Sequence, residues 1–148
     1  MITSEMKKEM KVVRLSKEAE TPEYAMESDV GFDLRAAEDV CIEPYEQKKV
    51  KTGLMIEIPE GHVGLIRDRA GIISKLGVHT AAGTFDPAYR GEVSIVLVNF
   101  GEESVRIEKG MRIAQMIVLP VVKVKIKDVK SLGKTKRADK SFGSTGLK

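Results

Sequence analysis

A segment bracketed by glycines, Gly83 to Gly91, carries three functional groups within five residues: the carboxylate of Asp86, the ring of Tyr89 and the guanidinium of Arg90. A carboxylate can take a proton from an attacking water, a ring can pack on a sugar or base, and a guanidinium can hold an anion or support a turn. Asp-Pro is also a common turn opener, so Asp86 taken alone is better explained as a turn former. The chemistry of this segment therefore depends on what the rest of the chain brings to it.

A second segment near the C-terminus reads Phe142-Gly143-Ser144-Thr145-Gly146. Hydroxyl and backbone N–H groups between glycines can wrap a phosphate, and an aromatic ring can cover the bound group. The same composition also fits a flexible linker. Phe142 argues for the first interpretation, because a large apolar ring in a solvated tail serves no purpose unless a surface covers it. Together the two segments predict an enzyme that acts on a nucleotide.

Two further features support an anionic ligand. Arg69 lies where the only good helix candidate, Gly71 to Leu76, begins, and its guanidinium could clamp a phosphate beside the helix N–H groups. A surface Arg–Asp cluster explains Arg69 equally well. Gln115 lies inside the apolar run from Ile113 to Ile117, and a buried glutamine needs polar partners, so lining a site is its simplest role.

Strand signals dominate the elements that would position these residues. The apolar periodicity predicts strands over residues 50–58, 63–66, 92–100, 105–107, 113–119 and 122–129. In the last run, valine and isoleucine alternate with lysine, which is the pattern of a half-buried strand. Short strands separated by Gly, Pro, Asn and Glu turns predict an all-β sandwich or barrel.

Length and composition set further limits. A chain of 148 residues with 42% hydrophobic residues is a single domain that needs no disulfide or metal to form a core. Cys41 is the only cysteine, and His62 and His79 have no cysteine neighbours, which argues against a disulfide and against a zinc site. Without an apolar run of about 20 residues or a signal-peptide core, we expect a soluble cytoplasmic protein with no membrane partner.

Charge divides the chain into a body and a tail. Residues 1–122 carry 16 Lys+Arg against 20 Asp+Glu, whereas residues 123–148 carry 9 against 2. We predict a β domain over residues 1–129 and a mobile tail over 130–148, where the strand pattern stops. A basic tail favours an anionic ligand, but one aromatic residue and no basic helix make a poor nucleic-acid footprint, so we expect no nucleic-acid partner.

Five motifs then occur in an order that is specific to one family. They are Ala25 to Ala36, Arg69-Ala70-Gly71 followed by Lys75, Gly83 to Gly91, Gly110 to Gln115, and Arg137 followed by Phe142 to Gly146. In this order the chain resembles the trimeric dUTPase family, the deoxyuridine triphosphate nucleotidohydrolases. The resemblance implies a jelly-roll-like β-clip barrel with one short helix, and a homotrimer with active sites between subunits. It also implies hydrolysis of dUTP to dUMP and pyrophosphate with Mg²⁺, which limits uracil in DNA and supplies dUMP for dTMP synthesis.

The resemblance also implies a role for each matching residue. Asp86 would be the general base, Tyr89 would pack under the deoxyribose, and Phe142 would close over the base. The uracil-reading hairpin would comprise Thr80, Gly83, Thr84 and Phe85. The remaining substrate-binding residues, most of them on the phosphates, would be Arg69, Ala70, Gly71, Gln115, Arg137, Gly143, Ser144 and Thr145. Asp33 would reach the magnesium ion indirectly, through water.

Departures from the family pattern leave two alternatives open. Ala70 replaces a serine, Asp68 replaces a common proline, Ala88 and Met111 replace common aspartates, and Ala138, Lys140 and Ser141 replace glycines. Asp86-Pro87 and Gly110-Met111 resemble the sister dCTP deaminases, so a deaminase or bifunctional enzyme is one alternative. However, the deaminase glutamate would fall at Val96, which cannot move a proton. The other alternative is a catalytically weakened regulator with the dUTPase fold.

Overall fold

The computed structural model describes residues 8–146, which form ten strands and one short helix. In chain order these are β1 (Lys11–Arg14), β2 (Phe32–Arg35), β3 (Val40–Ile42), β4 (Gln47–Glu57), β5 (His62–Arg67), α1 (Ala70–Leu76), β6 (Val78–Ala81), β7 (Thr84–Phe85), β8 (Glu92–Asn99), β9 (Val105–Ile107) and β10 (Arg112–Pro120). The predicted all-β class with one short helix is confirmed. Among these residues no helix is long and apolar enough to cross a bilayer.

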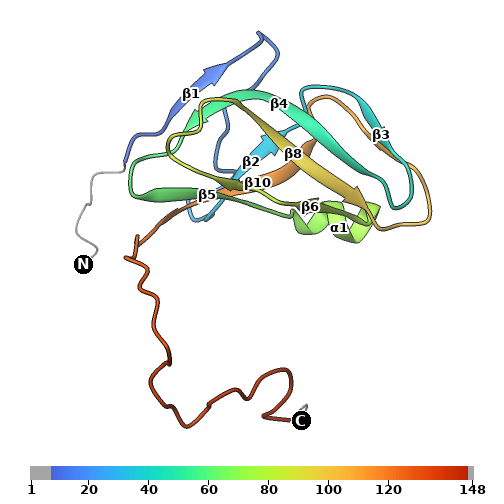
Figure 1. The fold of residues 1–148 in the computed structure, drawn as a ribbon. Coiled ribbons are helices and arrows are strands. Elements are labelled where there is room, and N and C mark those ends of the chain that lie inside the picture. Colours follow the sequence, from blue (N-terminus) through green and yellow to red (C-terminus); the bar gives the residue numbers. More distant parts are fainter. Residues whose placement is uncertain (1–7, 147–148) are drawn as a thin grey trace.

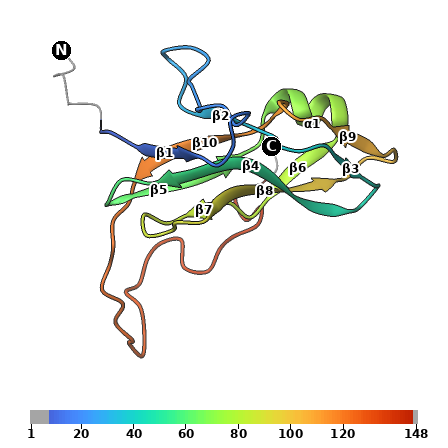
Figure 2. The ribbon, with the colours of Figure 1, turned by 90° about the horizontal axis from the view of Figure 1, so that it is seen from above.

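The strands form two four-stranded sheets and a two-stranded ribbon, all with antiparallel pairing (Figures 1 and 2). One sheet has the order β1-β4-β8-β6, the other β2-β10-β5-β7, and the ribbon pairs β3 with β9. The sheets remain open, so the architecture is of the jelly-roll type without the closed barrel that the sequence also allowed. One edge strand of the first sheet is β6, which leads directly into the turn before β7 and Asp86.

Alternating burial explains why these segments form strands around a common core. In β8 every second side chain, at Val93, Ile95 and Leu97, is buried, while the residues between them are half-exposed. Each fully buried aliphatic side chain of this size contributes roughly 1.5–3 kcal/mol to folding. Side chains from both sheets meet in one cluster, whose largest fully buried members include Phe32, Leu34, Ile42, Leu54, Ile58, Ile95, Leu97, Ile107, Ile113 and Met116.

Five of the six predicted strands are confirmed as β4, β5, β8, β9 and β10, and the predicted helix is confirmed as α1. The strands that the sequence did not predict are β1, β2, β3, β6 and β7. They have four residues or fewer, so their alternating pattern is weak. Among strands this short, only β9 was predicted, from Val105 and Ile107 on either side of Arg106.

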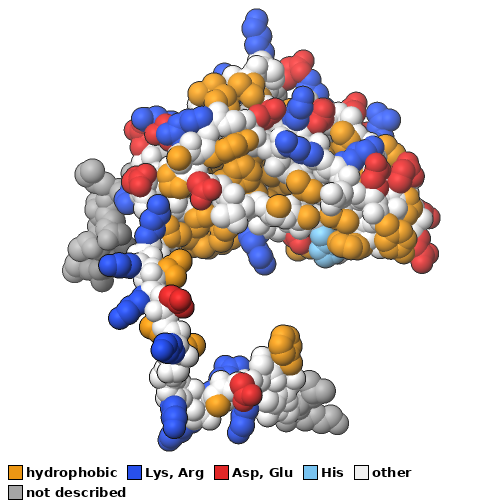
Figure 3. All heavy atoms as spheres, viewed as in Figure 1, with side chains coloured by type: hydrophobic (Ala, Val, Ile, Leu, Met, Phe, Trp, Pro, Cys, Tyr) orange, Lys and Arg blue, Asp and Glu red, His pale blue; other side chains and the backbone are white. Residues whose placement is uncertain are grey.

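The predicted strand over residues 122–129 is wrong. After Pro120 the chain leaves the body and forms no further strand within the described residues (Figure 1). Its apolar side chains lie in solvent: Val122, Val124 and Ile126 are 88%, 75% and 91% exposed. A strand needs hydrogen bonds from a neighbouring strand, and the body of a single chain offers this segment none. Figure 3 shows basic side chains along the tail beyond it.

Candidate active site

A tight turn between β6 and β7 positions Asp86; it crosses from the first sheet, where β6 pairs with β8, to the second, where β7 pairs with β5. Its turn residues Ala82 and Gly83 have φ angles of 61° and 115°. The Ile66 N–H donates to the Gly83 carbonyl at 2.9 Å. A Cβ added to Gly83 would lie 2.5 Å from the Cβ of Ile66, so only glycine fits this conformation and this close approach. The turn is thus fastened to β5 immediately before Thr84 and Asp86.

Asp86 and Tyr89 line one shallow cavity of about 260 Å³, together with Lys49, Thr84, Phe85, Glu92 and Ser94. The Tyr89 N–H donates to the Asp86 carbonyl at 3.1 Å, which confirms that Asp86 opens a turn. The Tyr89 ring stands edge-on to Phe85 with a centroid separation of 5.7 Å, and its hydroxyl donates to the Glu92 carbonyl at 2.9 Å.

The Asp86 carboxylate itself is exposed and forms no hydrogen bond or ion pair with another described residue. The turn therefore uses the backbone of Asp86 and leaves the carboxylate available. The two explanations for this residue, a turn former and a proton acceptor, are compatible in one geometry.

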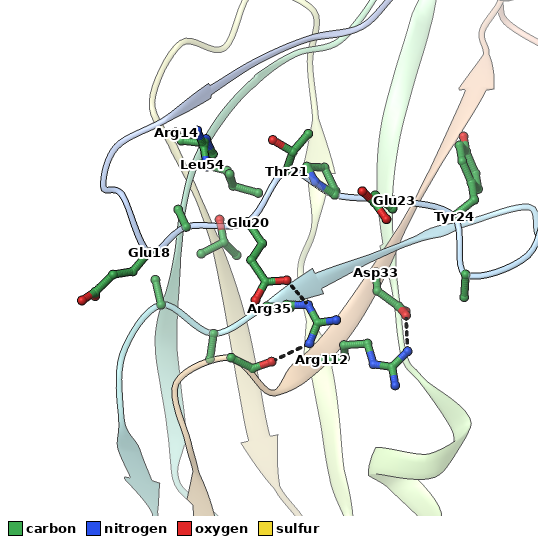
Figure 4. Close-up of a pocket in the computed structure, with 17 residues that line it drawn as sticks. Arg14, Glu18, Glu20, Thr21, Glu23, Tyr24, Asp33, Arg35, Leu54 and Arg112 are labelled. Carbon is green, nitrogen blue, oxygen red and sulfur yellow. Dashed lines mark hydrogen bonds and ion pairs between the residues drawn. The ribbon is translucent and has the colours of Figure 1, made fainter.

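A second cluster forms around Asp33 on β2. Its carboxylate contacts the Arg69 Nε at 2.8 Å and the Arg112 Nη1 at 3.4 Å (Figure 4 shows the contact with Arg112). Asp33 is well covered, with a side chain that is 17% exposed. Two guanidinium groups on one carboxylate leave a net positive charge, so this cluster favours an anion. Arg112 is not among the site residues predicted from the sequence, since nothing in its motif distinguishes a binding arginine from a charge at the end of a strand.

Gln115 joins the same cluster from β10. Its Nε2 donates to the Asp68 carbonyl at 2.9 Å, which confirms the expectation that this glutamine has a polar partner. A Cβ on Gly31 would lie 2.6 Å from the Gln115 Oε1, so the absence of a side chain at Gly31 makes room for the amide. Asp33, Arg69, Ala70, Gly71 and Gln115 line a cavity of about 360 Å³ together with residues of the 25–31 loop.

Asp68 connects this cluster to the β6–β7 turn. Its carboxylate accepts hydrogen bonds from the Thr80 N–H at 2.6 Å and the Thr80 hydroxyl at 2.7 Å, and contacts the His79 Nδ1 at 3.2 Å. Burial acts to raise the pKa of the Asp68 carboxyl, but these hydrogen bonds outweigh it, so the pKa lies below its usual value. From the sequence, Asp68 stands out only as a departure from proline, because its partners lie 11 and 12 residues further along the chain.

A third cavity, about 430 Å³, lies beneath the loop of residues 18–25 and reaches Asp33 (Figure 4). Arg35 spans it, with ion pairing to Glu20 at 3.1 Å and donation to the Gly110 carbonyl at 2.8 Å. These contacts fasten the loop and the β9–β10 turn to β2. They hold in place the strand that carries Asp33.

The sequence-predicted site residues fall into three separate groups in one chain. The cavity around Asp86 and the cavity around Arg69 share no lining residue. The third group is on the tail, where Arg137 donates to the Lys140 carbonyl at 3.1 Å and Phe142 is fully exposed. Figure 1 shows the tail leaving the body and running apart from the two sheets. Gly143, Ser144 and Thr145 are also exposed tail residues.

The donor set offers little to a resident metal ion. Within residues 8–146 no three His, Cys, Asp or Glu side chains come together in a way that could hold one. Asp33 is already neutralised by two arginines. Residues 8–146 of one chain therefore offer no cage of three or more side chains for a divalent cation.

Fold and cavities together are those of an all-β enzyme that handles an anionic substrate. Comparison with known proteins makes this specific: the dUTPase family model matches residues 17–146. A deoxyuridine 5'-triphosphate nucleotidohydrolase from Clostridium tetani is 44% identical over 139 residues, which cover 93% of this chain and 96% of that protein. One from a Hydrogenobaculum species is 45% identical over 140 residues, 93% of this chain and 97% of that protein. The chain belongs to the dUTPase family.

Solved structures agree. A mutant dUTPase of Staphylococcus bacteriophage 80alpha with dUpNHpp superposes with a TM-score of 0.89 at 34% identity, covering 94% of this chain and 99% of the phage protein. A mutant dUTPase from phage phi11 of S. aureus, described with a structural Mg(II) ion, gives a TM-score of 0.78 at 28% identity, over 84% of this chain and 98% of that one.

Proposed function

We propose that this protein hydrolyses dUTP to dUMP and pyrophosphate, which keeps uracil out of DNA and supplies dUMP for dTMP synthesis in the cytoplasm. The observation that carries the proposal is the exposed carboxylate of Asp86 in the same cavity as the ring of Tyr89. Both follow a turn that the close packing of Gly83 on Ile66 fastens to β5. Family membership supports the substrate, because the relatives from Clostridium tetani and Hydrogenobaculum are named for dUTP hydrolysis.

Asp86 is the general base in this proposal. Its carboxylate is exposed and has no hydrogen-bond or ion-pair partner among the described residues, so it can accept a proton from water as the water attacks a phosphorus atom. A positioned base of this kind accelerates a reaction about 10²–10⁴-fold. Most of the remaining acceleration in phosphoryl chemistry comes from alignment of the nucleophile and neutralisation of charge on the oxygens.

The β6–β7 turn selects the base and Tyr89 selects the sugar. Backbone groups from Thr80 to Phe85 read the edge of uracil, which offers an N3–H donor and an O4 acceptor, whereas cytosine reverses this pattern. A mismatched base leaves buried polar groups without partners, which is a strong basis for rejection. The Tyr89 ring packs beneath the deoxyribose, where a 2′-hydroxyl would collide with it.

The cluster of Arg69 and Gln115 holds the phosphate chain, with Ala70 and Gly71 beside it. Magnesium would be held mainly by the triphosphate and would neutralise its charge, because within residues 8–146 no three acidic, histidine or cysteine side chains come together to bind an ion. A water-mediated contact between Asp33 and that magnesium stays a prediction. In this structure Asp33 orients Arg69.

We propose further that the protein assembles as a homotrimer with active sites between subunits. Three groups of site residues lie apart in one chain and need partner chains to meet. The apolar side chains of residues 122–129 and of Phe142 in the tail are exposed in one chain, and contact with a partner chain would bury them. In the assembled site Arg137, Gly143, Ser144 and Thr145 reach the phosphates and Phe142 covers the base.

Geometry favours this hydrolase over a deaminase. Val96 is a half-buried apolar residue on β8, at the position where deamination needs a proton carrier. The nearby Glu92 carboxylate already accepts the Gly53 N–H at 2.9 Å. No other acidic residue lines the Asp86 cavity. A regulator that binds nucleotide without turnover is the second alternative, and only an assay separates it from the enzyme.

The test is release of pyrophosphate and of ammonia, measured side by side with dUTP, dCTP, dTTP and UTP in the presence of magnesium. We expect pyrophosphate from dUTP, little from the other three, and no ammonia from any. Ammonia from dCTP at a comparable rate would establish a deaminase. Binding of dUTP without pyrophosphate release would establish the regulator.

A further inference from the structure

Asp68 lies in the short turn between β5 and α1, opposite the outer edge of β6. As the last strand of its sheet, β6 has no strand partner on that side. Backbone groups at a sheet edge need other partners or exposure to water. The Asp68 carboxylate provides such a partner for Thr80. Among the described residues, those next to Asp68 in sequence form no other hydrogen bond with this edge of β6.

At Thr80 the carboxylate takes up every donor. One oxygen accepts both the backbone N–H at 2.6 Å and the side-chain hydroxyl at 2.7 Å, while the second oxygen faces the His79 Nδ1 at 3.2 Å. In a strand, the N–H and C=O of one residue point to the same side. The Thr80 carbonyl therefore lies on the same free edge as the N–H that Asp68 holds. With its donors occupied, Thr80 presents only acceptors along this edge.

The backbone of Asp68 belongs to the other cavity. Its carbonyl accepts the Gln115 Nε2 at 2.9 Å, and the next residue, Arg69, is held by Asp33. Two residues earlier, the Ile66 N–H binds the Gly83 carbonyl. The segment from Ile66 to Asp68 thus bonds the β6–β7 turn at two points, Thr80 and Gly83. The same segment leads into Arg69 and provides the carbonyl that binds Gln115.

We infer that Asp68 is a positioning residue for nucleotide binding: its carboxylate sets the conformation of Thr80 and holds the β6–β7 turn in a fixed position relative to Arg69 and Gln115. The inference rests on the proposed function of these two groups. Asp68 itself touches no reacting atom in this scheme. Asp68 acts on the substrate only through the edge of β6. Its replacement should therefore change nucleotide affinity and base preference more than the rate of the chemical step.

The simpler explanation is that Asp68 only stabilises a strand edge. Asp39 provides a matched control, since its carboxylate accepts a backbone N–H, that of Lys109, at 2.7 Å and pairs with Arg106. Asp39 lines none of the cavities described above. A purely structural role predicts that Asp68→Ala and Asp39→Ala change unfolding alone.

The experiment measures KM and kcat for dUTP and dCTP with the wild-type protein, Asp68→Ala, Asp68→Asn and Asp39→Ala, and hydrogen exchange at the Thr80 amide. For Asp68→Ala we expect a KM for dUTP raised about tenfold, the size expected for losing one well-formed hydrogen bond. Preference for dUTP over dCTP should fall, Thr80 exchange should accelerate, and kcat should stay within about threefold. Asp68→Asn should retain most of the wild-type KM, because the amide oxygen can still accept from Thr80. Asp39→Ala should match the wild type.

Equal KM and equal base preference in Asp68→Ala and Asp39→Ala would overturn the inference, even if Asp68→Ala unfolds at lower temperature. If Asp68→Ala does not fold, Thr80→Val removes only the hydroxyl donor. It should raise the KM about threefold at unchanged kcat, and an unchanged KM there would also overturn the inference. Wild-type protein that releases no pyrophosphate from dUTP would instead reject the proposed function.

Discussion

At the scale of single residues, Asp86 shows how one side chain can satisfy two explanations. Its backbone carbonyl closes the turn with Tyr89, and its carboxylate remains exposed and without an internal partner. Replacement by the isosteric amide should keep the turn and remove the base. Asp86→Asn should therefore lower kcat by about 10²–10⁴. Calorimetry with a non-hydrolysable dUTP analogue should give nearly wild-type affinity. If most of the activity survives, Asp86 is a turn former alone.

Ala70 is the second residue to test, because the resemblance implies a serine there. It is exposed at the first position of α1 and lines the cavity with Arg69, so a hydroxyl has room. A donor that meets charge developing on the leaving pyrophosphate acts mainly in the transition state. Such a donor is worth on the order of 10²–10³ in rate, and we expect Ala70→Ser to gain near the low end, in kcat more than KM. Steady-state kinetics of both proteins measure it, and an unchanged or lower kcat would show that another donor already serves position 70.

Asp68 predicts a pH dependence of stability. Its pKa is lowered in the folded protein, so ionisation stabilises the fold above the unfolded-state value near 3.8 and stops doing so as pH falls through the lower folded value. Asp68→Asn cannot titrate. The wild type should exceed Asp68→Asn in free energy of unfolding at neutral pH, and the difference should shrink below about pH 4. Denaturant melts from pH 7 to pH 2 test this, and a difference independent of pH would contradict it.

At the scale of elements, the tail is the part whose role a single chain leaves open. Phe142 is fully exposed, and the backbone hydrogen bonds described for residues 141–146 join residues within that segment. If it closes over bound nucleotide, deletion of residues 141–148 should cripple turnover while the oligomer remains intact. Deletion of residues 147–148 alone is the matched control and should leave activity unchanged. Limited proteolysis gives a second measure: a non-hydrolysable analogue should protect the tail, and unchanged cleavage would contradict the lid.

At the scale of the whole molecule, separation of the cavities makes the assembly testable. Asp86→Asn and Arg69→Ala should each be nearly inactive as pure proteins. If an active site takes these two residues from different subunits, co-expression in equal amounts should restore about a quarter of wild-type activity through mixed oligomers. A mixture of Asp86→Asn with Asp86→Ala is the control and should stay inactive. No recovery in the first mixture would place both residues of a site in one subunit.

Sequence by itself determined the features whose signal is local. Apolar residues with a period of two identified β4, β5, β8 and β10, and Asp-Pro indicated the turn at Asp86. A glutamine inside the apolar run of β10 indicated that Gln115 has a polar partner. These succeed because strand periodicity and turn chemistry act between residues close along the chain.

Only the tertiary structure decided which distant groups meet. Strand pairing brings Asp68 to Thr80 and two arginines to Asp33. It also separates the two cavities. The segment 122–129 shows that a local pattern alone does not make a strand. Its alternating pattern was real, but a strand exists only where a neighbouring strand accepts its hydrogen bonds, and no periodicity within the segment can supply that neighbour.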